Sequence, residues 1–356
     1  SWQFFLLTLF LKIKMIFIYL STLLIFILFI NKFLLKKNIL INETGDLHQK
    51  FSSKSSVPLT GGVFIFLGFL FYYDGIYSFI LFSLAILILG ILSDLKLIRS
   101  AKKKLFLQIF FILFYIIYND VQLSDTRIDF LNMILRNNYI NYFFVTFCIL
   151  IIVNGSNFID GMNTLCIGYY LLITSIIYYL KFSDLINIEN ISILYLFIVL
   201  LFAFIINLKN KFFLGDSGAY LIGFIFSILL INIYKWNPEL SPFFIILLLW
   251  YPSYENLFSI FRKNILKRSA MFPDAKHAHQ LIYFFIYKKY RLTSFQSNIF
   301  TSQIINTYNF LIMLIALNFI SNSKIQISLI IFNIMFYNLI YLKLFKYKYT
   351  KSFNIK

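Results

Sequence analysis

The sequence predicts an all-α polytopic membrane protein with about 10–11 transmembrane helices and an active site in its cytoplasmic loops. Of the 356 residues, 60% are hydrophobic and only 13% are charged, whereas soluble domains are roughly half apolar and about one quarter charged. Apolar runs close to the ~20 residues that cross a bilayer recur along the whole chain. No polar stretch is long enough to fold alone, so we expect a single membrane-embedded unit.

Eleven apolar segments are predicted to span the membrane, with boundaries set only to within several residues. They are 15–31, 57–73, 75–92, 105–118, 142–157, 164–180, 191–207, 218–234, 242–259, 303–321 and 325–342. Residues 15–343 therefore form the expected transmembrane domain, and residues 344–356 form a basic tail. Residues 1–14 are an expected upstream extension, because Met15 stands just before the first span. That span lacks a small-residue cleavage site and runs into lysines, so we predict no removable signal peptide.

Lysines and arginines are distributed unequally between the two sides of the predicted membrane. Twenty-five of the 32 fall on one side, and loops rich in Lys and Arg stay in the cytoplasm. We therefore predict the amino terminus outside and the carboxyl terminus inside. The net charge of +18 follows largely from this topology and does not indicate a nucleic-acid partner. The remaining cations could bind anionic lipid heads or an anionic substrate.

Almost every group capable of chemistry lies in the inner loops, which are 32–56, 93–104, 154–163, 208–217 and 260–302. The outer loop 119–141 is a short polar connector. Cys148 and Cys166 have no spacing that indicates a disulfide or a zinc site. The clustering of polar groups on one face is the main indication of function.

The stretch "NGSNFIDGMNTL" (154–165) follows an apolar run and places Asn154, Asn157, Asp160 and Asn163 three residues apart. At that spacing they form a drifting stripe at a helix end, and the glycines between them should open the helix into a loop. Asn amides offer donors and acceptors together, which suits a nucleobase edge or sugar hydroxyls. The alternative is a polar connector with an Asx turn, although Asp within a span costs about 2.5–3.5 kcal/mol.

The stretch "FFLGDSGAYLIGF" (212–224) is a second candidate site. Asp216 or Ser217 is placed to cap the apolar helix that follows, and Gly215 and Gly218 let other groups approach the backbone closely. A helix amino terminus attracts phosphate, and a carboxylate beside it can hold a divalent cation. A plain helix cap is the alternative.

The stretch "GILSDLKLIRSAKKK" (90–104) places Asp94 at the inner end of the third span, followed by five cations. Mg²⁺ prefers hard oxygen ligands and takes one or two protein carboxylates plus phosphates and waters. Asp94 and Asp216 are therefore the predicted metal ligands, and the cations would screen a pyrophosphate. Positive-inside topology alone would also produce such a run of cations.

Two histidines, His277 and His279, alternate in "PDAKHAHQ" (273–280). Their spacing is poor for one helix face, and no cysteine completes a zinc set. Imidazoles in a basic loop are better suited to donate hydrogen bonds to phosphate or sugar oxygens, although surface histidines often have no function. His48 belongs to "DLHQKFSSKSSVPLTGG" (46–62), a weaker signal on the same predicted face.

Taken in order, "HQKF…VPLTGG", "GILSDL", "NGSNFIDGMNTL", "FLGDSGAYLIGF" and "DAKHAH" resemble the motifs of the polyprenyl-phosphate N-acetylhexosamine-1-phosphate transferases. The resemblance runs from Met15 to about Gln280. It implies a multi-pass enzyme of the bacterial cytoplasmic membrane that needs Mg²⁺, with Mn²⁺ as an alternative. A polyprenyl phosphate would attack the β-phosphate of a UDP-amino sugar and yield a polyprenyl diphosphate sugar and UMP. This reaction would begin a cell-surface glycan or cell-wall polymer, and a homodimer is a candidate assembly.

The resemblance also implies roles for individual residues. Asp94, Asp160 and Asp216 look like the catalytic carboxylates, with Asp94 and Asp216 as metal ligands. The implied substrate contacts are Asn154, Asn157, Asn163, Lys104, Ser217, His277, His279 and His48. The two loop histidines are closer to the GlcNAc-type enzymes of the family, and the identity of the amino sugar stays open.

The chain departs from the family's pattern at three positions. Ser93 precedes Asp94 where a second acid is usual, Asn163 replaces an Asp, and Thr164 stands where Gly is common. The acceptor is a phosphate monoester that is already largely ionised at neutral pH, so we expect turnover without an acid at position 93. The alternatives are a non-catalytic relative that acts as a scaffold, which the departures favour, and an ion-coupled transporter, which the nearly charge-free span interiors disfavour.

Overall fold

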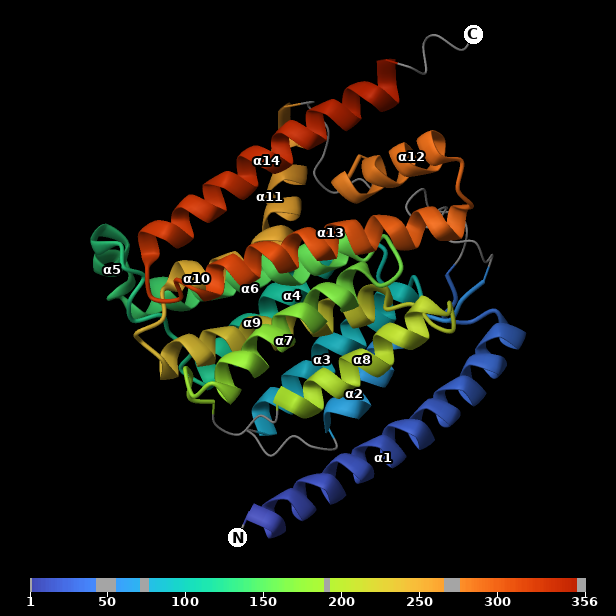
Figure 1. Ribbon diagram of the computed structural model, residues 1–356, viewed down its shortest axis with the longest axis horizontal. Coiled ribbons are helices and arrows are strands. Elements are labelled where there is room, and N and C mark those ends of the chain that lie inside the picture. The colour runs from blue at the N-terminus through green and yellow to red at the C-terminus, as the bar shows by residue number, and fades with distance from the viewer. Residues whose placement is uncertain (1, 43–55, 71–76, 189–192, 266–275, 351–356) are drawn as a thin grey trace.

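The computed structural model describes residues 2–42, 56–70, 77–188, 193–265 and 276–350, and within these ranges it contains 14 helices and no β-strand. The helices are α1 (Trp2–Lys37), α2 (Gly61–Leu70), α3 (Tyr77–Asp94), α4 (Ala101–Tyr118), α5 (Asp129–Leu135), α6 (Asn138–Ile159), α7 (Leu165–Phe182), α8 (Ile193–Leu208), α9 (Gly215–Trp236), α10 (Pro242–Leu248), α11 (Trp250–Ile265), α12 (Ala278–Tyr290), α13 (Ser294–Leu317) and α14 (Ser323–Thr350). Figure 1 shows α1 and α14 on opposite sides of the helix bundle.

α9 lies at the centre of the bundle and packs against α2, α3 and α6. In the apolar stretch of α9, 94% of the residues are buried, compared with 22% in α1 and in α14. A helix that is apolar all round is stable only when other elements surround it. Several helices at once therefore fix the first turn of α9, where the candidate residues Asp216 and Ser217 lie.

Each of the eleven predicted spans overlaps one or two helices in the described parts of the chain. Seven helices are long and apolar enough to cross a membrane, and α10 and α11 together would make eight. The predicted spans 57–73, 105–118 and 191–207 lie on α2, α4 and α8. Of these, α2 and α8 are shorter, with 10 and 16 residues, and α4 carries three lysines in its first turn. The prediction of an all-α polytopic membrane protein is confirmed.

The predicted span 242–259 is broken into α10 and α11, which are bent by 73° relative to each other. Pro252 lies in the first turn of α11, where its missing N–H group cannot donate to the carbonyl of Leu248. The hydroxyl of Tyr169 donates to that carbonyl instead, at 2.9 Å. The bend sends α11 across the direction of α13 toward α14, as Figure 1 shows.

Two short helices lie where the sequence predicts only loops. α5 lies in the connector 119–141, and α12 lies in the loop 260–302. His277 is the N-cap of α12, and its N–H group donates to Oε1 of Gln280 at 3.1 Å. The two histidines therefore occupy the start of a helix, which restrains them more than a loop would.

Candidate active site

The first turn of α9 is capped by a carboxylate from another helix. The sequence predicts that Asp216 or Ser217 caps this helix, but α9 begins at Gly215, so this prediction is wrong. Asp94, at the end of α3, accepts hydrogen bonds from the backbone N–H groups of Asp216 at 2.9 Å and Ser217 at 3.1 Å. A Cβ atom on Gly215 would lie 2.7 Å from Oδ2 of Asp94. The close approach expected at Gly215 is confirmed, and the N–H groups that could have bound phosphate are occupied by Asp94.

The carboxylate of Asp216 accepts hydrogen bonds from side chains of four helices. The donors are Nζ of Lys104 at 3.0 Å, Nδ2 of Asn157 at 2.7 Å, the hydroxyl of Tyr220 at 3.2 Å, and the hydroxyl of Ser93. The Lys104 and Asp216 side chains are 25% and 23% exposed, so this ion pair is open to solvent or substrate. Side chains from α3, α4, α6 and α9 thus meet at the Asp216 carboxylate. Because each of them donates a hydrogen bond to this carboxylate, the contacts favour its ionised form.

Asp160 lies just beyond the end of α6, within electrostatic reach of Asp94 and Asp216. Burial raises the pKa of Asp160 well above its usual range, and the charges of Asp94 and Asp216 raise it further. A hydrogen bond from the N–H group of Gly215 lowers this pKa and only partly offsets the other effects. Three carboxylates in a partly dry site repel one another. A cation placed among them would relieve that repulsion.

The turn after Asp160 is held by a buried amide network. The backbone N–H group of Asn163 donates to Oδ1 of Asn298 at 2.8 Å, and its side chain donates to Oδ1 of Asn210. The N–H group of Thr164 donates to Oδ1 of Asn207 at 2.6 Å. These bonds hold the turn between α6 and α7 against α8 and α13. The structure therefore gives Asn163 a role in packing, and its contact with substrate stays a prediction.

Thr164 has a φ of +64°, in the left-handed region that a β-branched residue rarely adopts. This backbone conformation gives a physical reason for the glycine expected at this position from the family's pattern. The Oγ1 atom of Thr164 is buried and has no hydrogen-bond partner among the described residues. Thr164 is therefore strained at both its backbone and its side chain.

Two other predicted substrate contacts also bond within the protein. Nδ2 of Asn154 donates to Oε1 of Gln108 at 3.0 Å, which joins α6 to α4. The hydroxyl of Ser217 is fully buried and donates to the carbonyl of Leu214 at 3.2 Å. Contacts of Asn154 and Ser217 with substrate stay predictions, and His48 lies outside the described residues.

His277 and His279 pack against the residues on either side of Asp160. Their imidazole rings are stacked with centroids 5.6 Å apart, and the Phe158 ring lies 5.1 Å from the His277 ring. A Cβ atom on Gly161 would lie 2.4 Å from Nε2 of His279, so this packing requires glycine. The histidine motif and the central motif thus form one continuous unit, as their predicted common face implies.

The donor chemistry of this region fits a Mg²⁺ or Mn²⁺ ion that substrate phosphates complete. Asp94, Asp160 and Asp216 supply hard oxygen atoms, and these three side chains lie within electrostatic reach of one another. Among the described residues, no three His, Cys, Asp or Glu side chains are placed to hold a metal ion alone. Mg²⁺ usually keeps several waters and takes one or two carboxylates plus phosphate oxygens, so a complete protein cage is not required.

Two important residues were not predicted as members of the site. Glu255 lies within the predicted span 242–259, is 0% exposed, and its Oε1 atom lies 2.9 Å from Nδ1 of His277. An acidic residue inside a span is itself a signal for a functional site, so the sequence did contain the clue. Tyr220 follows Asp216 by one helical turn, a spacing that places the two side chains on one face.

Part of the chain is similar in sequence to known proteins. Residues 76–234 match the sequence model of the family described as glycosyl transferase family 4. The chain is 28% identical over 233 residues to the probable undecaprenyl-phosphate N-acetylglucosaminyl 1-phosphate transferase of Bacillus subtilis (strain 168), covering 63% of this chain and 64% of that protein. It is also 28% identical over 249 residues to the undecaprenyl-phosphate alpha-N-acetylglucosaminyl 1-phosphate transferase of Thermotoga maritima, covering 68% and 75% respectively. The matched region thus spans less than two thirds of the Bacillus relative's length.

Proposed function

We propose that the chain belongs to glycosyl transferase family 4, whose model matches residues 76–234, and that it transfers an N-acetylhexosamine-1-phosphate from a UDP-amino sugar to a polyprenyl phosphate. Both relatives are named as undecaprenyl-phosphate N-acetylglucosaminyl 1-phosphate transferases. The observation that carries the proposal is the meeting of the Asp94, Asp160 and Asp216 carboxylates with Lys104 and Asn157 at the first turn of α9. Such an oxygen-rich site beside a lysine suits a diphosphate that binds with a divalent cation.

The proposed reaction is a single phosphoryl transfer. An oxygen atom of the polyprenyl phosphate attacks the β-phosphorus of the UDP-amino sugar and forms a new P–O bond. The bond from that phosphorus to the bridging oxygen breaks, and the electron pair leaves with UMP. The attacking phosphate has a second pKa near 6, so it needs no strong base at neutral pH.

The protein's part in this reaction is positioning and neutralisation of charge. Lys104 lies 3.0 Å from Asp216, and its ammonium group is placed to move onto a phosphate oxygen when a cation engages Asp216. Asn157 donates to the same carboxylate at 2.7 Å, which keeps Asp216 oriented. Mg²⁺ bound at these carboxylates would neutralise the charge that develops on the diphosphate.

We assign the reaction to the cytoplasmic face of a bacterial inner membrane. The unequal distribution of lysine and arginine supports this assignment, because cationic loops remain in the cytoplasm. The product, a polyprenyl diphosphate sugar, would be the first lipid-linked intermediate of a cell-surface glycan or a cell-wall polymer. UDP-N-acetylglucosamine is the first donor to test, because both relatives are named for N-acetylglucosamine.

The test uses the full-length chain in lipid nanodiscs with undecaprenyl phosphate, Mg²⁺ and a panel of UDP-amino sugars. We expect UMP release with at least one donor, and Asp216→Asn should abolish it while the protein remains inserted. Asp184→Asn is the matched control, because Asp184 is exposed, lies beyond α7 and has a φ of +53° that asparagine tolerates. Release by Asp216→Asn at the wild-type rate would remove Asp216 from the site. No UMP from any donor would favour a scaffold without catalytic activity.

A further inference from the structure

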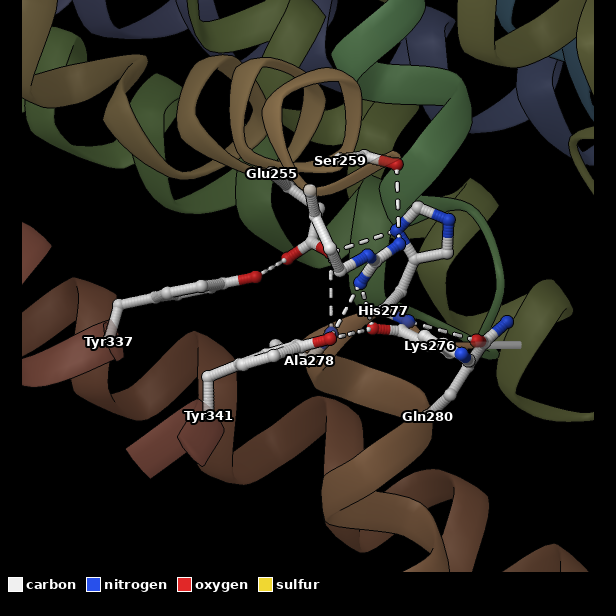
Figure 2. Close-up of polar contacts among 9 residues, drawn as sticks. Glu255, Ser259, Lys276, His277, Ala278, Gln280, Tyr337 and Tyr341 are labelled. Carbon is white, nitrogen blue, oxygen red and sulfur yellow. Dashed lines mark hydrogen bonds and ion pairs between the residues drawn. The ribbon is translucent and has the colours of Figure 1, made fainter. Parts of the chain in front are cut away.

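The buried carboxylate of Glu255 is held by donors from two other helices. Its Oε1 atom lies 2.9 Å from Nδ1 of His277 and accepts a hydrogen bond from the N–H group of Ala278 at 3.3 Å. Its Oε2 atom accepts one from the hydroxyl of Tyr337 in α14 at 2.7 Å. Figure 2 shows these groups converging on Glu255 from the start of α12 and from α14. Both carboxylate oxygens are therefore used inside the protein.

These contacts determine which nitrogen of His277 carries a proton. The N–H group of Ala278 and the hydroxyl of Tyr337 both donate to Glu255 and favour its ionised form, and an ionised carboxylate can only accept hydrogen bonds. Nδ1 of His277 must therefore carry the proton that is donated to Glu255. A carboxylate that fixes one imidazole nitrogen also fixes the direction of the ring. Nε2 is then the ring nitrogen that does not face Glu255.

The peptide that precedes His277 is held by side chains of α11 and α14. Arg262 of α11 donates to the carbonyl oxygen of Lys276 and, at 2.8 Å, to the hydroxyl of Tyr341 in α14. Tyr341 donates to the same carbonyl at 3.0 Å. Figure 2 shows Tyr337 and Tyr341 reaching side by side from α14 toward this segment. One turn of α14 thus restrains both the backbone and the side chain of the first motif histidine.

The restrained imidazole lies against the motif that carries Asp160. Phe158 packs on the His277 ring at 5.1 Å, and the His277 and His279 rings are stacked with an interplanar angle of 8°. The His279 ring in turn fills the space beside Gly161. A rotation of His277 would therefore disturb the packing on both sides of Asp160.

We propose that Glu255 and Tyr337 are positioning residues that hold His277 in its Nδ1-protonated form for the transfer reaction. The inference rests on the proposed function and extends it to α14, which lies outside the segment 76–234 that matches the family. In this arrangement α14 packs on the start of α12 and orients an imidazole that lies against the motif carrying Asp160.

The kinetic test compares two tyrosine-to-phenylalanine variants that each remove one hydroxyl. Tyr337→Phe loses the bond to Glu255 but keeps a ring that packs 5.0 Å from Tyr254 and 5.3 Å from Phe258. Tyr308→Phe is the control, because its hydroxyl also bonds a residue of α14, Asn333 at 2.6 Å, but does not contact the histidines. We expect kcat to fall by about tenfold in Tyr337→Phe, as for loss of a hydrogen bond to a charged group, with little change in the KM for either substrate. Tyr308→Phe should keep the wild-type kcat.

The second test needs no turnover and so remains valid if the proposed function fails. The chain has 3 histidines, so ¹⁵N-histidine labelling gives three imidazoles, and His48→Ala identifies one of them. We expect one of the two remaining rings to be in the Nδ1–H form in the wild type. Glu255→Ala should release it into exchange between tautomers, whereas Tyr308→Phe should leave it unchanged.

Each outcome decides the proposal. A selective loss of kcat in Tyr337→Phe together with the tautomer change in Glu255→Ala supports it. Equal losses in Tyr337→Phe and Tyr308→Phe would mean that α14 matters only for packing, which overturns the positioning role. An unchanged tautomer in Glu255→Ala overturns it as well, and so does a changed tautomer with an undiminished kcat in Tyr337→Phe.

Discussion

Ser93 donates its hydroxyl hydrogen to the carboxylate of Asp216. The residue that departs from the family's pattern of paired acids is thus a hydrogen-bond donor inside the site. A donor here supports the ionised form of Asp216, whereas a second acid would add negative charge beside the Asp94 and Asp160 carboxylates. Ser93 therefore contributes a hydrogen bond to Asp216 without adding a further negative charge beside the three carboxylates.

Replacing this serine by an acid should not improve turnover. In Ser93→Asp the lost hydrogen bond and the added like charge should lower kcat or leave it unchanged, because the acceptor phosphate needs no base. Ser93→Ala isolates the lost hydrogen bond and should lower kcat by a few fold. Steady-state UMP release measures both variants. An inert wild-type protein that Ser93→Asp activates would contradict this account.

Lys104 should contribute more to the reaction than the other lysines in the first turn of α4. Its ammonium group lies 3.0 Å from Asp216, whereas Lys103 is exposed on the same turn. Lys104→Gln should lower kcat by about 10²-fold, as for loss of one group that stabilises the transition state. Lys103→Gln removes the same charge and should change kcat little. Similar losses in both variants would indicate a general effect of charge on substrate binding.

Thr164 should limit the stability of the turn between α6 and α7. Relief of its left-handed backbone by Thr164→Gly should raise the free energy of unfolding by about 1 kcal/mol, and it also removes a buried hydroxyl without a described partner. Thr174→Gly, in the middle of α7, should instead destabilise the protein by a similar amount. Thermal unfolding in detergent compares the two. A lower melting temperature for Thr164→Gly would contradict the strain.

Gly161 should tolerate a side chain only when His279 is truncated. The Cβ atom of Gly161→Ala would lie 2.4 Å from Nε2 of His279, so this variant should lower both the melting temperature and kcat. In the double variant with His279→Ala the clash disappears, and the stability loss should be smaller than the sum of the single losses. Additive losses in this double-mutant cycle would show that the two residues do not touch.

Removal of the Asp160 charge should stabilise the protein when no divalent cation is present. Because its pKa is raised in the folded state, Asp160 favours folding below its unfolded pKa of about 3.9. That contribution is lost as the pH rises through the folded pKa. At neutral pH in EDTA, Asp160→Asn should therefore melt at a higher temperature than the wild type. The advantage should shrink in Mg²⁺, and an unchanged melting temperature in EDTA would contradict the proposed repulsion.

The arrangement of spans followed from the sequence because the length of an apolar run is a local property. The break at Leu249 did not, since Pro252 in a first turn is compatible with an unbroken apolar run as well as with a bend. α12 was also missed, because its apolar and cationic residues show no periodicity that separates a short helix from a polar loop. The break involves a hydrogen bond from the distant Tyr169, and α12 packs against α13 and α14.

The main members of the site were predictable, but their connections were not. The sequence placed Asp94 and Asp216 together, yet it could not show that Asp94 caps α9 through backbone N–H groups. Spacing likewise could not show that Asn163 bonds to Asn210, just after α8, and to Asn298 in α13, because these partners lie 47 and 135 residues away. Glu255 shows the reverse case, in which the sequence signal was present and its partners in α12 and α14 were needed to interpret it.

The most direct test of the account is mass spectrometry of the lipid product after incubation with undecaprenyl phosphate, UDP-N-acetylglucosamine or another UDP-amino sugar, and Mg²⁺. The account predicts a lipid heavier by one N-acetylhexosamine phosphate, formed in equal amount with UMP and absent with Asp216→Asn. A lipid heavier by the sugar alone, formed with UDP, would show that sugar rather than sugar phosphate is transferred. That result would contradict the central claim, and so would the absence of any lipid product with every donor.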